Sequence, residues 1–181
     1  MSVSQQNAET ATVLMQAHPT PTLLEGDARS LCERADAGRR EHCGDAVHLR
    51  GIIEFSNACS RNCAYCGLRH RNATLARYTM PTDEILRVAA DAAAAGVRTI
   101  VLQSGEDDML PPEWLAEIIA AIKRDHDVAL TVSVGVKPPE VYAMWREAGA
   151  DRYLLKHETA RTAHYAQLHS DSQLDDRVEA L

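Results

Sequence analysis

From His48 onward, short β-rich runs alternate with stretches that have the marks of helices. The β-rich runs read HLRGIIEFS, VRTIVLQ, DVALTVSV and DRYLLK. Between them lie TDEILRVAADAAAAG, PPEWLAEIIAAIKRDH and PPEVYAMWREAG, which open on acidic residues or on proline, as helices do. Strands that alternate with helices are joined as parallel neighbours by right-handed crossovers. The order therefore predicts an α/β fold, either a β/α barrel or a doubly wound parallel sheet.

The third β-rich run favours the barrel. Because side chains alternate along a strand, its apolar residues share one face and its smaller, more polar residues the other. The apolar face carries Val128, Leu130, Val132 and Val134, and the other face carries Ala129, Thr131 and Ser133. Polar groups near the carboxyl end of a strand are typical of a barrel with a site in its mouth, and Gln103, Lys156 and Glu158 occupy similar places. A doubly wound sheet with a site at its switch point remains the alternative.

The length predicts only part of a barrel. A complete eight-stranded β/α barrel takes about 250 residues, whereas this chain has 181. We therefore expect a partial TIM-type barrel of about four β/α units over residues 48–181. The final stretch, SQLDDRVEAL, has a helical pattern without a stop signal, so we expect the natural reading frame to continue or the gene to be truncated.

Two segments are expected to precede the barrel. Residues 22–47 are predicted to be helical, because apolar residues recur there every three or four positions. These residues are Leu24, Ala28, Leu31 and Ala35. Residues 1–21 mix Gln, Thr, Ala and Pro without periodicity, which predicts a flexible N-terminal segment.

The composition limits the partners and the compartment. With 26 acidic and 19 basic residues the net charge is −7, which argues against a nucleic-acid partner. The sequence has no apolar run near the roughly 18 residues that would indicate a membrane span. Its first twelve residues lack the basic and apolar regions of a secretory signal, which predicts a cytoplasmic location. In that reducing compartment, the five cysteines are expected to be free thiols or metal ligands.

Three of the cysteines, Cys59, Cys63 and Cys66, stand close together after the first β-rich run. This spacing is compatible with a 4Fe–4S cluster, whose fourth iron would stay open. It is equally compatible with a zinc site completed by His70, or with a redox pair of Cys63 and Cys66. The remaining two, Cys32 and Cys43, are expected to be small buried hydrophobic residues rather than ligands.

The chain resembles the radical S-adenosylmethionine (SAM) enzymes in its CxxxCxYC motif. Within them it is similar to the (FeFe) hydrogenase maturases of the HydE subgroup, with methylornithine synthase and biotin synthase as more distant relatives. The segments that carry this resemblance are HLRGIIEFSNACSRNCAYCGLR, RYTMPTDEI, TIVLQSGED, EAGADRYLL and KHETA.

The resemblance implies an enzyme in which three cysteines hold a 4Fe–4S cluster and SAM chelates the fourth iron. Reductive cleavage of SAM would then give a 5′-deoxyadenosyl radical that acts on a small-molecule substrate during assembly of the hydrogenase cofactor. The implied partners are an electron donor, such as a ferredoxin or flavodoxin, and other hydrogenase maturation proteins. A methylornithine synthase-like mutase and a non-catalytic cluster-binding fragment are the alternatives.

The same resemblance assigns cofactor-binding residues. Cys59, Cys63 and Cys66 would be the iron ligands, and Tyr65 would pack near the adenine. Ser104 and Gly105 would meet the SAM amino group. For the rest of SAM, the resemblance implies contacts from Glu158 at the ribose or amino end and from Arg177 at the carboxylate.

Residues of the substrate cavity follow in the same way. Gln103, Thr131 and Ser133 match the polar positions that line it in the family. The chain departs from the family at Lys156, where relatives usually have arginine, and loses the bidentate guanidinium there. It departs again at Val136, where relatives commonly have glutamate.

Overall fold

The computed structural model describes residues 27–181. The chain divides into two compact units, and the boundary in the sequence falls between His48 and Leu49. The flexible segment expected over residues 1–21, and the first residues of the helix expected over 22–47, lie outside the described residues. No helix among residues 27–181 is long and apolar enough to cross a membrane.

The described part of the first unit contains one helix, α3 (Ala28–Cys43). Asp27 begins it, since its carboxylate accepts a hydrogen bond from the Ser30 amide at 3.1 Å. The helix has no buried residue. Cys32 and Cys43 are therefore exposed, and the prediction that they are buried is wrong. Polar and charged side chains surround them on a helix that buries none of its faces.

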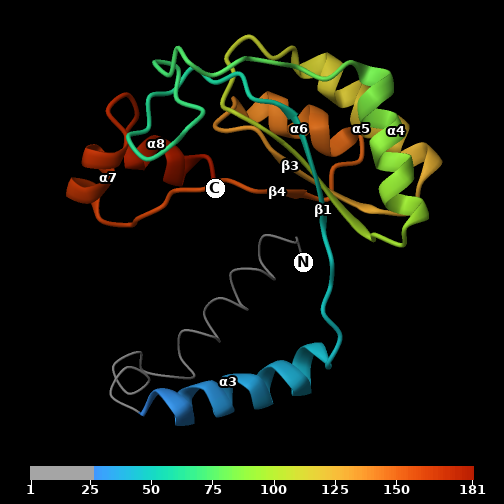
Figure 1. Cartoon of the computed structure of the whole chain (residues 1–181), viewed down its shortest axis with the longest axis vertical. Helices are drawn as coiled ribbons and strands as arrows, with labels where there is room; N and C mark the ends of the chain where they lie inside the picture. The colour runs from blue at the N-terminus through green and yellow to red at the C-terminus, as the bar shows by residue number, and fades with distance from the viewer. Residues whose placement is uncertain (1–26) are drawn as a thin grey trace. The chain divides into compact units, whose positions relative to one another are not determined.

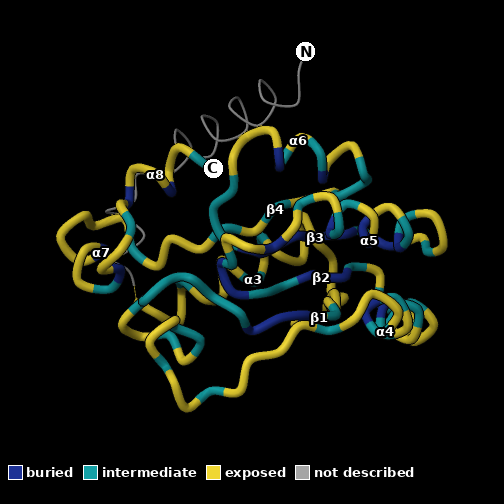
Figure 2. Tube along the Cα trace, turned by 90° about the horizontal axis from the view of Figure 1, so that it is seen from above, coloured by how far each residue is buried: buried dark blue, intermediate teal, exposed yellow. Residues whose placement is uncertain are grey.

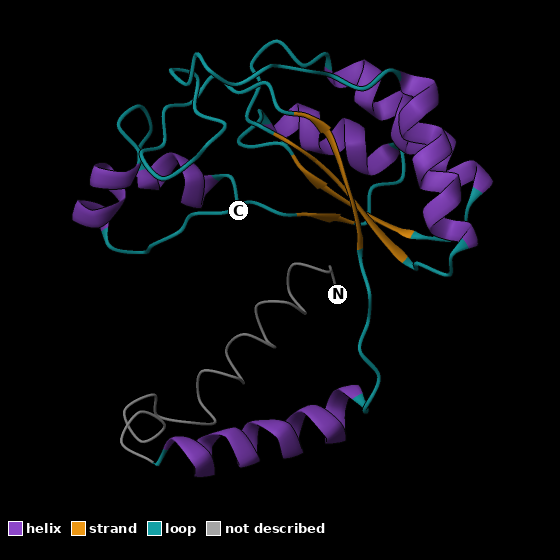
Figure 3. Ribbon diagram, viewed as in Figure 1, coloured by secondary structure: helices purple, strands orange, loops and turns teal. Residues whose placement is uncertain are grey.

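The second unit is built on a parallel sheet in the order β1-β2-β3-β4. The strands are β1 (Gly51–Ser56), β2 (Thr99–Ser104), β3 (Ala129–Ser133) and β4 (Arg152–Tyr153). All neighbours pair in parallel, which confirms the predicted α/β fold (Figure 3). The fourth strand is much shorter than the run DRYLLK that predicted it.

Three helices connect the strands and cover one face of the sheet (Figures 1 and 2). They are α4 (Thr82–Ala94), α5 (Pro112–Asp125) and α6 (Pro139–Glu147). A proline precedes or opens each helix and an acidic residue stands in its first turn, as the sequence predicted. Two short helices follow β4, namely α7 (Thr162–Leu168) and α8 (Leu174–Glu179). The pattern SQLDDRVEAL predicted α8, whereas no pattern predicted α7.

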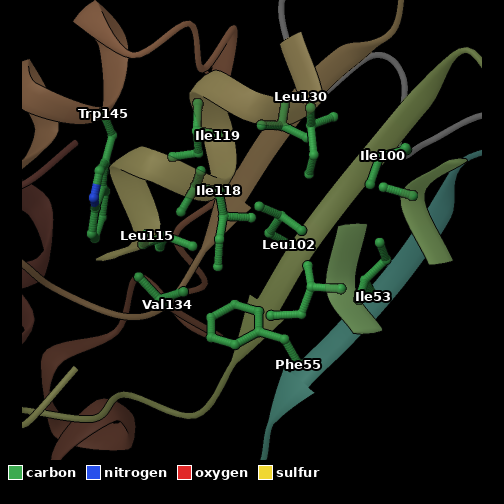
Figure 4. Close-up of a cluster of buried hydrophobic side chains, with 14 of the residues drawn as sticks. Ile53, Phe55, Ile100, Leu102, Leu115, Ile118, Ile119, Leu130, Val134 and Trp145 are labelled. Carbon is green, nitrogen blue, oxygen red and sulfur yellow. The ribbon is translucent and has the colours of Figure 1, made fainter. Parts of the chain in front are cut away.

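The core lies between the sheet and the three covering helices (Figure 4). Ile53, Leu102 and Val132 are paired in register and form one row across it. From the helices, Trp145 is almost fully buried, and its indole N–H donates to the Pro112 carbonyl at 2.9 Å. The predicted apolar face of the third strand is buried throughout.

The opposite face of the sheet carries a different register row, Ile52, Val101, Thr131 and Arg152. No helix of residues 49–181 covers this face (Figure 2). Ile52 is accordingly 59% exposed. In a closed barrel this face would be the interior. Val101 and Thr131, on the two central strands, are nevertheless buried, so the exposed residues of this row lie on the outer strands β1 and β4.

Candidate active site

The cysteines lie on a long loop, residues 57–79, that leaves β1 and returns to it; we call it the cysteine loop. Ser56 at the end of β1 forms an antiparallel bridge with Thr79, so the two ends of the loop meet. Asn57 ties them further, because its side-chain oxygen accepts a hydrogen bond from the Tyr78 amide at 2.8 Å. The pairing of β1 with β2 is irregular at this end of β1, a feature often found next to active sites.

All three cysteines of the loop line one cavity of about 250 Å³. Cys59, Cys63 and Cys66 are free thiols and partly buried. The amide of Cys66 donates to the Cys63 carbonyl at 3.1 Å, so the last two cysteines share a tight turn. The loop therefore presents three thiols to the same space.

The rest of the cavity wall comes from the carboxyl ends of the strands and from α8. This is the edge at which β/α folds place their sites. The lining residues outside the cysteine loop are Gln103, Ser104, Gly105, Glu106, Ser133, Gly135, Leu154, Leu155, Lys156, Glu158 and Arg177.

A buried carboxylate joins the loop to α8. Glu106 accepts a hydrogen bond from Arg61 Nε at 2.7 Å and another from Arg177 Nη2 at 3.1 Å. Burial acts to lower the pKa of Arg177, but Glu106 and Tyr165 together outweigh it and the pKa is raised, so this arginine stays charged. Arg61 lies between Cys59 and Cys63 in the sequence, so the ion pairs of Glu106 fix the cysteine loop between its first two cysteines.

Two glycines allow the chain to approach this carboxylate and the loop. A Cβ on Gly135, whose φ is 84°, would overlap the side chain of Glu106. A Cβ on Gly105 would overlap the backbone carbonyl of Ala58 and come within 2.7 Å of the Cys59 Cβ. The backbone at Gly105 therefore packs directly against the first cysteine.

We expect Gly105→Ala to displace the start of the cysteine loop, because the atom that the new Cβ meets belongs to the backbone and cannot rotate away. The free energy of unfolding should fall by roughly 1–3 kcal/mol, as for other overpacked sites. Urea denaturation would measure this loss, with Gly67→Ala as control, since a Cβ there meets no atom within 4 Å. Equal unfolding midpoints for the two variants would contradict the close approach.

The segment from α7 to α8 holds the other side of the loop. The Ala64 amide donates to the Leu168 carbonyl, and the Asn62 amide donates to Asp171 Oδ2, both at 2.8 Å. These contacts join residues more than 100 positions apart in the sequence. The cysteine loop is thus held on one side by the sheet edge and on the other by the α7–α8 segment. Figures 1 and 2 show the loop beside this segment.

His169 is the buried centre of that segment. Its Nε2 lies 3.3 Å from the hydroxyl of Tyr65, the residue between Cys63 and Cys66. Its ring packs on Tyr165 with centroids 4.1 Å apart, and the Tyr165 hydroxyl accepts a hydrogen bond from Arg177 Nε at 2.9 Å. The Nδ1 atom has no hydrogen-bond partner among the described residues. His169 and Tyr165 therefore form a chain of contacts between Tyr65 and Arg177, which both line the cavity.

The pKa of His169 is lowered by burial and by the charge of Arg177. The unfolded chain consequently takes up a proton below about pH 6.5 more readily than the folded protein, and stability falls as the pH is lowered from there. We expect His169→Phe to lose less stability between pH 7 and pH 5 than the wild type does. Urea midpoints at both pH values would test this, with exposed His164→Phe as control; an unchanged pH dependence in His169→Phe would contradict it.

Burial raises the pKa of the Cys63 thiol, and the carboxylate of Asp171 adds to this effect. The thiol form is therefore favoured until a metal replaces the proton. Within residues 27–181, no three His, Cys, Asp or Glu side chains are grouped as ligands of a single metal ion. A 4Fe–4S cluster does not require such convergence, because each cysteine binds a different iron. His70 lines a separate cavity that it shares with Cys59 but not with Cys63 or Cys66.

The cavity brings together most residues predicted for the site. Tyr65, Ser104, Gly105, Glu158 and Arg177 all line it, as do Gln103, Ser133 and Lys156. Thr131 is buried on the same sheet face but is absent from the lining. It lies one pleat further from the carboxyl end than Ser133, deeper along the strand. Val136 lines a smaller neighbouring cavity with Arg61 and Asp171.

Glu158 has an unusual backbone for its residue type. Its φ of 63° lies in the left-handed region, where it is the only non-glycine residue among those that the structure describes. Strained residues of this kind cluster at ligand-binding positions. The backbone thus marks the same residue that the sequence resemblance selected.

Sequence reasoning gave no role to several residues that build the site. Glu106 stands in the predicted QSGE run, but its ion pairs with Arg61 and Arg177 are tertiary contacts that no local pattern announces. His169 and Asp171 were also missed, since α7 and the turn after it were not predicted. The available signal was the acidic run from Glu106 to Asp108 after β2, since the cysteine loop has no carboxylate of its own to pair with Arg61.

The sequence profile of the radical SAM superfamily matches residues 53–181, which include the cysteine loop, the α7–α8 segment and all of the sheet except the first two residues of β1. The chain belongs to the radical SAM superfamily. It is 47% identical over 156 residues to the [FeFe] hydrogenase maturase subunit HydE of Thermotoga maritima, covering 86% of this chain and 44% of that protein. It is 28% identical to the 3-methylornithine synthase of Methanosarcina barkeri, covering 88% and 47% of the two chains.

Solved structures of radical SAM enzymes have the same fold. The crystal structure of methylornithine synthase (PylB) aligns with a TM-score of 0.78 at 28% identity, covering 88% of this chain and 49% of that one. The hydrogenase maturase HydG aligns with a TM-score of 0.77 at 23% identity, covering 87% and 37%, which bears on the fold alone. The chain spans less than half the length of the two sequence relatives named above.

The residues present fit the 4Fe–4S cluster and the SAM that this superfamily implies. Three thiols on one loop supply the sulfur ligands that iron–sulfur clusters take. Gly105 lets the strand-end backbone approach Cys59 more closely than any residue with a Cβ would allow. The cavity also offers a cationic group, Arg177, and an anionic group, Glu158, for a zwitterionic ligand.

Proposed function

We propose that Cys59, Cys63 and Cys66 bind a 4Fe–4S cluster, that SAM binds beside it, and that the protein acts as a radical SAM enzyme in [FeFe] hydrogenase maturation. One observation carries the proposal: the three thiols share a single cavity with the strand-end residues expected to hold SAM. The identity of 47% to a HydE maturase supports the maturation role. When bound, the cluster supplies the electron that cleaves SAM to a 5′-deoxyadenosyl radical.

The residues of this chain bind and orient SAM. Tyr65 would lie against the adenine, and its contact with His169 fixes the ring. The backbone of Ser104 and Gly105 would meet the amino group. Glu158, which lines the cavity and has its backbone in the left-handed region, would contact the ribose or amino end.

Arg177 would bind the SAM carboxylate while remaining anchored. Its guanidinium already donates to Glu106, to the Tyr165 hydroxyl and to the Lys156 carbonyl. A guanidinium has five N–H groups, so two remain, one on each terminal nitrogen. Two donors suffice for a bidentate carboxylate contact, and the three existing bonds orient them in advance.

The substrate is proposed to lie on the inner face of the sheet. Gln103 and Ser133 are paired in register and line the cavity, and Gln103 donates to Glu54 at 3.3 Å. Thr131 would contribute from the deeper row. We assign residues 48–181 to this catalytic domain, 22–47 to an N-terminal helical region and 1–21 to a flexible segment. A cytoplasmic location, a ferredoxin or flavodoxin as electron donor, and association with other maturation proteins belong to the same proposal.

The deciding experiment is anaerobic reconstitution with iron and sulfide, followed by EPR of the dithionite-reduced protein with and without SAM. We expect a 4Fe–4S signal that changes when SAM is added, and 5′-deoxyadenosine in the reaction mixture. Arg177→Gln should keep the cluster signal and lose most of its response to SAM. A cluster signal that SAM leaves unchanged in the wild type would contradict the proposal and favour a non-catalytic cluster-binding protein.

A mutase of the methylornithine synthase type is the second candidate, favoured by the TM-score of 0.78 to PylB. It predicts that lysine is converted to 3-methylornithine when SAM and reductant are present. Mass spectrometry of the reaction would detect that product. Formation of 5′-deoxyadenosine without any change in lysine would favour the maturase.

A further inference from the structure

The cysteine loop has a charge opposite to that of the chain. Between Asn57 and Thr82 the sequence has four arginines and neither Asp nor Glu, although the net charge of the chain is −7. Arg61 is neutralised by Glu106. The other three, Arg69, Arg71 and Arg77, we call the arginine patch.

The arginine patch keeps its positive charge. Arg69 donates to the Cys66 carbonyl at 3.0 Å, and Arg77 donates to the carbonyls of Asn57, Leu68 and Arg69 at 2.6 to 2.8 Å. These acceptors are neutral backbone groups. Arg71 is exposed, and its guanidinium has no hydrogen bond or ion pair with any residue in the described range 27–181. The three charges are therefore uncompensated, and two of the side chains are held in place.

The patch adjoins a second opening toward the cysteines. A cavity of about 490 Å³ is lined by Cys59, His70, Arg77 and Met109, among others. Cys59 also lines the cavity assigned to SAM, so its surroundings are reached from two sides. Met109 is 84% exposed and gives the surface an apolar contact point. Asp107 is the one carboxylate in this lining, and it accepts a hydrogen bond from the Met109 amide.

We propose that the arginine patch and Met109 are the docking surface for an acidic one-electron carrier protein. This inference rests on the proposed function and extends it by assigning the surface through which the reductant reaches the cysteine loop. An apolar contact with a charged rim is typical of protein interfaces, and uncompensated positive charge selects a negative partner. Docking here leaves the SAM cavity free. The carrier would lose one electron and the cluster gain it, with no bond formed or broken in the protein.

The test is binding of an acidic flavodoxin to the full chain, with and without reconstituted cluster, measured by isothermal titration calorimetry at low and high salt. We expect Arg71→Glu to weaken binding about tenfold at low salt and Arg71→Lys to change it less than about twofold, since only the first reverses the charge. Binding should weaken as salt is raised, because the charges are exposed. The control is Arg146→Glu on α6, an exposed arginine on the helix-covered side of the sheet.

Equal weakening by Arg71→Glu and Arg146→Glu would overturn the docking surface, because only net charge would then matter. Binding of single-stranded RNA, rather than flavodoxin, with the same dependence on Arg71 would overturn it as well. The proposed function is tested separately by SAM cleavage with dithionite, which needs no carrier protein. Absence of cleavage by the wild type in that assay would contradict the function and leave the docking result unaffected. With dithionite, Arg71→Glu should cleave SAM as the wild type does, whereas with flavodoxin its rate should fall about tenfold.

Discussion

Replacing any one of Cys59, Cys63 and Cys66 by alanine is expected to reduce the iron retained after anaerobic reconstitution from about four atoms per chain to less than about one. Each cysteine would bind a separate iron, and the SAM-facing iron has no protein ligand to begin with. Loss of a second ligand leaves half of the cluster without sulfur from the protein. We therefore expect no stable cluster in any of the three variants.

Iron and sulfide assays on gel-filtered protein would measure this loss. Cys43→Ala is the matched control, because Cys43 is an exposed free thiol on α3 and should not affect the iron content. Wild-type iron in the Cys66→Ala variant would contradict a three-cysteine cluster. One zinc per chain and no iron in the wild type would instead support a zinc site.

Replacing Glu106 by glutamine is expected to lower the free energy of unfolding by roughly 3 kcal/mol. The substitution leaves the buried guanidinium of Arg177 without its counter-charge, and removing one partner of a buried ion pair typically costs about 3–5 kcal/mol. Arg61 loses the same partner, but it is more exposed and adds less. Urea denaturation of the protein without cluster would measure the difference.

Asp91→Asn provides the comparison for Glu106→Gln, since Asp91 pairs with Arg87 on the surface of α4, where an ion pair contributes at most about 1 kcal/mol. Glu106→Asp keeps the charge on a shorter side chain and should recover part of the loss. Similar stabilities of Glu106→Gln and Asp91→Asn would mean that the buried carboxylate is not the link between the cysteine loop and α8.

Much of the fold could be predicted because its signals are local. Prolines and acidic first turns mark α4, α5 and α6, and the alternation of Val128 to Val134 identified the face that packs in the hydrophobic core. The helix α7 was not predicted because its first turn, which starts at Thr162, has neither the proline nor the acidic residue that marks the other three. Cys32 and Cys43 were misjudged because cysteine is usually buried, whereas α3 buries no residue.

The residues of the site likewise divide into those that local sequence signals could place and those that they could not. Gln103, Ser104 and Ser133 could be placed together, since parallel strands bring their carboxyl ends to one edge. Thr131 shares the face of Gln103 and Ser133 but lies outside the cavity lining, because two residues along a strand move a side chain about 7 Å from the edge. The links from Glu106 to Arg61 and Arg177 span 45 and 71 positions, and they depend on how the elements pack.

The bridge between Ser56 and Thr79 affects how the cysteine loop acquires its cluster. Bringing together the ends of a chain segment of about 22 residues costs roughly 3 kcal/mol of configurational entropy. Here contacts between protein groups, in the sheet and at the Asn57 side chain, close the segment. Iron then meets thiols whose spacing is already restricted, so metal affinity should depend little on ordering the chain. Cluster insertion should accordingly follow folding instead of driving it.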